Sequence, residues 1–358
     1  MCIFVVRKTI RKMLYSEDTR IETLAVHVVG NKSKDEPLMI SPGVSPQVAD
    51  EGLMRTLTAY FLGGFKSEEC YNLYHETDLA CNEVWNFAGR IFDDPEAFYE
   101  HSVSLAKHLY ESGLHPQIKS GEFYAVYFSD CRFGGEPTDA LGLFKSETRD
   151  TFLDVGHEAE GVRIAAREGI DIKRLDKGAV IFNTDRETGF AVYIVDNTNR
   201  TEARYWIDDF LRVRQRQDDY HNTHNALAMC KKYVTKHLSK EFDVSKADQA
   251  EMLNDTINYF QEQDNFSLDE FSERVIRQPE VAESFARFKQ EYEQDRDIRI
   301  EDEFGISDSA VKKQARSYKS VIKLDRNFHI YVHGNRSLLE QGEDEKGKFY
   351  KVYYEEEQ

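Results

Sequence analysis

Residues 205–240 read YWIDDFLRVRQRQDDYHNTHNALAMCKKYVTKHLSK, and this stretch separates two halves of different character. Short β-branched and aromatic runs precede it, whereas longer amphipathic runs follow it. The stretch contains no Gly or Pro, which favours helix, and we expect two helices with a break near His221–Thr223. The chain therefore changes here from a strand-rich half to a helical half.

The half before this stretch predicts an antiparallel sheet. A hairpin is expected over 21–41, and tight turns are expected at 134–137 and 185–188, where Gly, Asp and Pro gather. Helical spacing of apolar residues from Ser45 to Phe61 and at 79–92 and 95–109 predicts helices, which we expect on one face of the sheet. Further β-prone runs lie at 123–133, 139–147, 151–155, 161–167, 178–184 and 189–197.

The half after the stretch carries helix-start signals and then strand patterns. Ser245, Ser267, Pro279 and Ser307 each precede a helical pattern, and Ser267 begins an S-x-x-E capping box. Alternating aromatic and β-branched runs at 320–324, 327–334 and 348–356 predict a small C-terminal sheet. The fold class is therefore α+β, and the expected parts are an extension (1–20), a sheet domain (21–200), a basic helical junction (201–240) and a helical domain with the small sheet (241–358).

Composition describes an ordinary globular chain with a marked acidic balance. The 358 residues include 47 Lys and Arg against 65 Asp and Glu, a net charge of −18. Such a charge repels nucleic acid at long range, so any binding to it requires a segregated basic surface. The five cysteines have no CxxC pair, and no segment has the pattern of a signal peptide or membrane span, so we expect a cytoplasmic protein.

No motif with a catalytic mechanism is present. A GxxxxGK[ST] phosphate-binding loop and a GxSxG motif are both missing, and His221 and His224 lack the Glu of an HExxH site. We interpret these two histidines as polar surface residues rather than metal ligands. The sequence therefore predicts a protein that is not an enzyme and has no cofactor or metal.

Residues 205–240 also carry a basic surface candidate. Seven Lys and Arg side chains stand against four Asp, a net charge of +3 in an acidic protein. Arg212, Arg214 and Arg216 alternate, with Lys231 and Lys232 further along, and Arg suits phosphate oxygens. Contact with a polyanion and neutralisation by the neighbouring aspartates are both compatible with this pattern.

A second basic candidate lies near the end of the helical half. Residues 307–323 have a net charge of +4 and include Lys312 and Lys313. They are weakly similar to the second helix of a helix-turn-helix, although a strand after this helix is equally expected.

Five segments of the chain carry a resemblance to a known family. They are VHVVGNK (26–32), FYAVYF with DALGLFKSE (123–128 and 139–147), DDFLRVRQRQDDYHNT (208–223), SKADQAEMLNDTINYFQEQDNFSLDEFSERV (245–275) and IKLDRNFHIYVHGN (322–335). In this order, and from about Ile21 onward, they resemble the bacterial 37 kDa nucleoid-associated protein family, in a form like that of Bacteroides-type bacteria.

This resemblance implies a non-catalytic DNA-binding protein of the cytoplasm and nucleoid. Duplex DNA is the implied ligand, and single-stranded DNA and a homodimer are left open. The matched positions that it carries over are Asp209, Phe210, Leu211, Arg214 and Asn222, together with the loop Gly30–Lys32. The alternative is an acidic adaptor that binds a chromosome-maintenance enzyme such as a topoisomerase. The expected nucleic-acid contacts are Arg212, Arg214, Arg216, Asn222, Lys231, Lys232, Lys32, Lys312 and Lys313.

Overall fold

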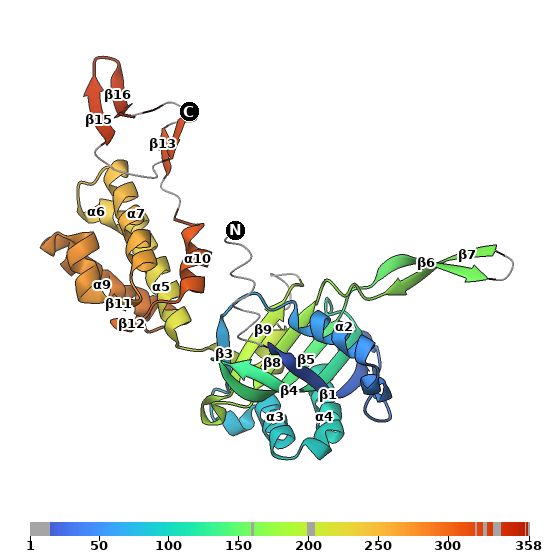
Figure 1. Cartoon of the computed structure of the whole chain (residues 1–358). Helices are drawn as coiled ribbons and strands as arrows, with labels where there is room; N and C mark the ends of the chain where they lie inside the picture. Colours follow the sequence, from blue (N-terminus) through green and yellow to red (C-terminus); the bar gives the residue numbers. More distant parts are fainter. Residues whose placement is uncertain are drawn as a thin grey trace. The chain divides into compact units, whose positions relative to one another are not determined.

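The computed structural model describes residues 15–158, 161–198, 205–318, 321–324, 328–331, 338–354 and 356. The chain forms two compact units, Met1–Arg216 and Gln217–Gln358 (Figure 1). The dividing point lies inside the segment 201–240, which the sequence predicts to be a single helical junction.

The first unit is built on an antiparallel sheet. Among the described residues the sheet has eight strands in the order β10-β3-β9-β8-β5-β4-β1-β2. The α+β class is confirmed, although the short strand β3 is absent from the sequence prediction. The strands are β1 (Tyr15–Val29), β2 (Leu38–Met39), β3 (Cys70–Leu73), β4 (Gly121–Phe133), β5 (Glu136–Ser146), β8 (Lys177–Phe182), β9 (Ala191–Asp196) and β10 (Val213–Gln215).

Tight turns join neighbouring strands of this sheet where the sequence predicts them. Gly134 and Gly135 connect β4 to β5 with φ values of 60° and 93°, the left-handed region that a two-residue hairpin turn requires. The β8–β9 turn contains the 3-10 helix η5 (Arg186–Thr188) and ends at Gly189 with φ 106°. Strand β1 begins at Tyr15, so its first residues belong to the segment expected as an extension.

Helices cover both faces of the sheet, so the expectation of helices on one face is wrong. Alternate residues of β4 enter different hydrophobic clusters, as Phe123 and Tyr124 show. Helices α3 (Glu83–Asp93) and α4 (Phe98–Ser112) pack on the Phe123 face, and α2 (Glu51–Leu62) packs on the Tyr124 face (Figure 1). The physical reason is that FYAVYF is apolar at every position, and a strand of that kind must be buried on both sides.

Asx caps start two of these helices later than the sequence predicts. The Asp50 side chain accepts a hydrogen bond from the Leu53 N–H and starts α2, while Asn82 accepts one from the Trp85 N–H and starts α3. The residues before these caps form short 3-10 helices instead. These are η2 (Pro46–Ala49) and η3 (Leu79–Cys81); η1 (Lys32–Lys34) and η4 (Pro95–Ala97) lie elsewhere in the unit.

The second unit is mainly helical around its own aromatic core, which includes Tyr233, Phe260 and Phe285. Ser245 and Asp248 form a complete capping box at the start of α7. The capping box predicted at Ser267 does not form, because Glu270 instead contacts Tyr259 and Arg274. The elements are α5 (Asp219–Lys232), η7 (Tyr233–His237), α6 (Leu238–Glu241), α7 (Lys246–Glu262), β11 (Asn265–Ser267), α8 (Leu268–Phe271), η8 (Ser272–Ile276), α9 (Pro279–Arg296), β12 (Glu303–Gly305) and α10 (Asp308–Ala315).

The C-terminal strands do not form the one small sheet that the sequence predicts. Within the described residues, β13 (Val321–Leu324) pairs only with β14 (Phe328–Tyr331). A second hairpin joins β15 (Leu339–Asp344) to β16 (Gly347–Val352). Strand β15 includes the acidic residues Glu343 and Asp344, which lie opposite Lys348 and Gly347 of β16.

His27 of β1 is a buried histidine with a hydrogen-bond partner at each ring nitrogen. Only 1% of the residue is exposed, and its Nε2 lies 3.1 Å from the Ser102 hydroxyl. The Ser41 N–H donates to His27 Nδ1 over 3.3 Å, so Nε2 carries the proton. Burial lowers the pKa of His27 below its usual 6.5, because the interior penalises the charged ring.

We expect the free energy of unfolding to fall as the pH is lowered from 7.5 to 5.5. The unfolded chain takes up a proton near pH 6.5 that folded His27 resists, so acid favours the unfolded state by up to about 1.4 kcal/mol per pH unit. Urea unfolding at both pH values measures this fall, and His27→Gln should reduce it. An equal fall in both proteins would contradict the assignment.

Candidate functional site

The first helix predicted in the stretch 205–240 is limited to a short π-helix. An edge strand follows it where the sequence predicts that the helix continues. Trp206 and Phe210 are fully buried in helix η6 (Trp206–Leu211), and Arg212 ends it with φ 50°. Strand β10 then pairs with β3. The break in the stretch therefore falls at 212–218, whereas His221–Thr223 lie inside α5. The alternating side chains of 212–216 fit a strand because side-chain direction repeats every two residues there.

The three alternating arginines have different surroundings. Arg212 Nη1 lies 3.5 Å from the Glu83 carboxylate, and Arg216 Nη1 lies 2.6 Å from that of Asp185. The Arg214 guanidinium lies 4.7 Å from the centre of the Tyr74 ring and is exposed. Two of the three charges are thus neutralised within the first unit, by carboxylates distant in sequence.

A cavity of about 580 Å³ lies beside η6 in the first unit. We name it the junction cavity. It is open to solvent, and its wall combines α3, the end of α4, the loop 113–118 and η6. Its lining residues are Glu83, His108, Glu111, Ser112, Leu114, His115, Pro116, Ile118, Tyr205, Asp209 and Arg212.

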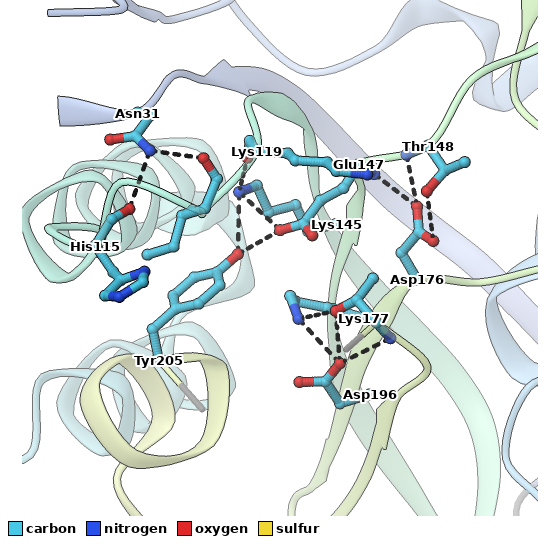
Figure 2. A network of polar contacts seen from close by, with 12 residues as sticks. Asn31, His115, Lys119, Lys145, Glu147, Thr148, Asp176, Lys177, Asp196 and Tyr205 are labelled. Atoms are coloured by element: carbon cyan, nitrogen blue, oxygen red, sulfur yellow. Dashed lines mark hydrogen bonds and ion pairs between the residues drawn. The ribbon is translucent and has the colours of Figure 1, made fainter. Parts of the chain in front are cut away.

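Asn31 holds the loop side of the junction cavity. Its side chain is completely buried, and its Nδ2 lies 3.1 Å from the His115 carbonyl and 2.6 Å from that of Ile118 (Figure 2). The neighbouring Lys32 forms an ion pair with Glu111, which lines the cavity. Two segments of the expected site, Gly30–Lys32 and 209–212, therefore meet at one cavity although the sequence separates them widely.

The charge inside the junction cavity is negative. Glu83, Glu111 and Asp209 contribute three carboxylates, and Arg212 contributes one guanidinium. Burial is the main cause that lowers the pKa of His108, so this ring is neutral near pH 7. The His108 Nε2 lies 3.0 Å from the Phe210 carbonyl. A cavity with this balance favours a cationic group over a phosphate.

A buried polar network lies behind the cavity wall (Figure 2). The Lys145 Nζ lies 2.7 Å from the Lys119 carbonyl, 3.0 Å from the Tyr205 hydroxyl and 3.1 Å from the Glu147 carboxylate. The Tyr205 hydroxyl donates to Glu147 over 2.6 Å. Burial raises the pKa of Tyr205 and lowers that of Lys145, while Glu147 favours the charged form of the lysine. The network orients Tyr205, which lines the cavity.

The expected site residues of the second unit lie in separate surroundings. Asn222 is buried and its Oδ1 accepts the Glu301 N–H over 3.2 Å. Lys312 lies 3.7 Å from Asp308, and Lys313 Nζ donates to the Tyr220 hydroxyl over 3.0 Å. These contacts give Asn222 and Lys313 structural roles within the unit.

His221 of α5 is buried, so it is not the polar surface residue that the sequence predicts. His221 is 3% exposed, and the His224 Nδ1 lies 3.1 Å from the Gln314 amide nitrogen. In the described part of the chain, no group of three or more His, Cys, Asp or Glu side chains is placed to hold a metal ion.

A lysine-rich helical run stands out on α5, η7 and α6. Residues 220–240 contain four lysines and no Asp or Glu. We name Lys231, Lys232, Lys236 and Lys240 the lysine run. Across the described residues none of the four forms an ion pair, although the Lys232 ammonium lies 5.2 Å from the centre of the Tyr292 ring. Lys236 and Lys240 are exposed. The expected contacts do not include Lys236 and Lys240, and the sequence signal that points to them is the absence of Asp and Glu from residues 220–240.

The family described as nucleoid-associated protein YejK matches residues 25–355. The chain belongs to this family. The match contains the loop Gly30–Lys32, the wall of the junction cavity and the lysine run. Searches of the curated proteins and of the solved structures found no match. Among the described helices of this family member, none combines the length and apolarity needed to cross a membrane.

We expect Asn31→Ala to destabilise the first unit by about 2–4 kcal/mol. The substitution leaves the carbonyls of the loop 115–118 buried without their donor, and each unsatisfied group costs about 1–3 kcal/mol. Urea unfolding provides the measurement. Ser33→Ala is the matched control, because the Ser33 hydroxyl contacts only the Asn31 Oδ1. Equal stability of Asn31→Ala and the wild type would show that the loop does not depend on Asn31.

Proposed function

We propose that this nucleoid-associated protein binds DNA without catalysis, through phosphate contacts made by the lysine run. The observation that carries the proposal is a set of four cations with no carboxylate partner among the described residues, in a chain of net charge −18. Free ammonium groups can neutralise phosphates and release counterions, whereas a paired cation must first exchange its carboxylate. Family membership supports location at the nucleoid, and hence in the cytoplasm.

The same reasoning divides the expected contacts into two groups. Arg214 is exposed and stacks on Tyr74, so it remains a proposed phosphate contact in the first unit. Arg212, Arg216, Lys32 and Lys312 each have a carboxylate partner and are weaker candidates for the same reason. DNA contact therefore depends on fewer cations than the sequence indicates, and we expect modest, strongly salt-dependent affinity.

We expect the double variant Lys236→Gln/Lys240→Gln to weaken DNA binding and its salt dependence. Each lost phosphate contact should reduce the slope of log K against log salt by about one unit, so the variant should lose about two. Fluorescence anisotropy of labelled duplex and single-stranded DNA between about 50 and 200 mM salt provides the measurement.

The control for this experiment is Lys351→Gln. Lys351 is also on the second unit, but its Nζ lies 3.4 Å from the Glu340 carboxylate, and its removal should leave the slope unchanged. An unchanged anisotropy of wild-type protein and DNA at low salt would overturn direct DNA binding. Equal slopes for the wild type and the double variant would overturn the role of the lysine run.

The adaptor is the second candidate, and the acidic junction cavity favours it. Three cavity carboxylates outnumber the two neighbouring cations, Arg212 and Lys32, and this balance suits a Lys or Arg side chain of a protein partner. A chromosome-maintenance enzyme such as a topoisomerase is the proposed partner, because the family is associated with the nucleoid. This function and DNA binding by the lysine run use different residues of the chain and can coexist.

We expect Glu111→Gln/Asp209→Asn to weaken binding to a purified bacterial topoisomerase by about tenfold at low salt, which corresponds to about 1.4 kcal/mol. Titration calorimetry measures the affinity. The matched control is Glu76→Gln/Glu96→Gln, which removes two exposed carboxylates of the first unit outside the cavity. An equal loss in both variants would indicate a general charge effect, and no binding by the wild type would exclude this partner.

A further inference from the structure

A positive charge on α9 lies beside one of the lysines of α5. The Arg296 guanidinium lies 4.7 Å from the centre of the Tyr292 ring, and the Lys232 ammonium lies 5.2 Å from the centre of the same ring. We name Lys232 and Arg296 the ring pair. The distance between their charges is at most these two distances together, although the residues belong to helices far apart in the sequence.

The spacing of side chains on α9 explains this position of Arg296. Phe288, Tyr292 and Arg296 follow one another at intervals of four residues, so they lie on one face of the helix. Phe288 and Tyr292 are buried in the aromatic core of the second unit, and the Lys232 ammonium lies over both rings. Arg296 is exposed and extends this face from the core to the solvent.

The acidic residues near Arg296 in the sequence do not neutralise it. The Glu293 carboxylate, one turn earlier on α9, lies 3.0 Å from the Lys289 ammonium. Asp295 and Asp297 are the immediate neighbours of Arg296, and adjacent residues of a helix do not face each other. In the part of the chain that the structure describes, no ion pair joins Arg296 to a carboxylate. The ring pair therefore keeps both of its charges.

Two like charges held against one ring repel each other. Salt screens such repulsion fully only beyond about 8–10 Å, which is comparable with the largest possible separation of the pair. An anion that contacts these cations removes the repulsion. Phosphate suits both members of the pair, because the planar guanidinium donates two parallel hydrogen bonds to phosphate oxygens and the ammonium acts as a point charge.

We propose that the ring pair binds phosphate groups of DNA, so that α9 contributes to the DNA-binding surface together with the lysine run. This role rests on the phosphate contacts proposed above for the lysine run. Lys232 belongs to both sets, so the cations of α5 and Arg296 form one continuous group. A nucleic-acid backbone presents a row of phosphates to such a group, whereas free phosphate would engage the ring pair alone.

Arg296 also occupies the last turn of α9, where a cation stabilises the negative end of the helix dipole. That role would affect the stability of the second unit and would leave the salt dependence of DNA binding unchanged. The salt dependence therefore separates phosphate contact from a purely structural role.

Fluorescence anisotropy of labelled duplex DNA with the full chain, between about 50 and 200 mM salt, tests the proposal. Arg296→Gln should reduce the slope of log K against log salt by about one unit, and Arg296→Lys should retain the slope because it retains the charge. Arg299→Gln is the matched control. Arg299 is also exposed, but its Nε lies 3.4 Å from the Glu301 carboxylate, so its removal should leave the slope unchanged.

Equal slopes for the wild type and Arg296→Gln would overturn the role of the ring pair, as would an equal loss in Arg299→Gln. Titration calorimetry with inorganic phosphate distinguishes the source of the anion. Saturable phosphate binding that Arg296→Gln abolishes, with an unchanged DNA slope, would assign the pair to free phosphate and overturn the proposal. If Arg296→Gln does not fold by circular dichroism, Arg296→Met provides the same test, because Met is a good helix former without charge.

The ring pair and the lysine run fail separately in this experiment. A reduced slope in Lys236→Gln/Lys240→Gln with a wild-type slope in Arg296→Gln would overturn the ring pair alone. The opposite result would overturn the exposed part of the lysine run and support the ring pair. Wild-type protein that does not bind DNA at low salt would overturn both.

Discussion

The first unit depends on the buried ammonium of Lys145. An amine in this position is costly unless its hydrogen-bonding capacity is used, and here the Lys119 carbonyl, the Tyr205 hydroxyl and the Glu147 carboxylate surround it (Figure 2). These partners come from a loop, from the start of η6 and from the end of β5. One buried charge thus joins the sheet to the segment where the chain leaves it.

Hydrogen bonds and an ion pair also fix the residues next to the Lys145 network. Asp176 accepts the N–H groups of Glu147 and Thr148 over 2.7 Å and 2.8 Å, and Lys177 Nζ lies 2.9 Å from the Asp196 carboxylate. The residues that follow β5 therefore have few alternative positions. These contacts, together with the hydrogen bonds of the Tyr205 hydroxyl, hold Tyr205 in place at the acidic junction cavity beside η6.

The charged side chains of the two units have different surroundings. Ion pairs within the first unit neutralise Arg212 and Arg216, and the cavity beside them is acidic. The lysine run has no such partners among the described residues of the second unit. A strongly acidic protein can contact a polyanion only where its cations are left free in this way. This segregation is the basis of the two proposed contacts, phosphates at the lysine run and a cationic side chain at the junction cavity.

Sequence patterns by themselves determined the class of the fold, most strands, the turns at Gly134–Gly135 and Asp185–Thr188, and the helix starts at Ser245, Pro279 and Ser307. These features depend on neighbours along the chain, such as a cap, a turn residue or an alternating apolar run. The resemblance in the segments around Gly30–Lys32 and 208–223 likewise indicated the family. Only the tertiary structure decided that helices cover both faces of the sheet and that 213–215 is an edge strand. Only it paired Arg212 with Glu83 and placed Asn31 behind the cavity. The edge strand, the Arg212–Glu83 pair and the Asn31 contacts depend on partners more than 80 residues away in the sequence, and an ion pair or a strand pairing of that range leaves no periodic signal in the residues that form it.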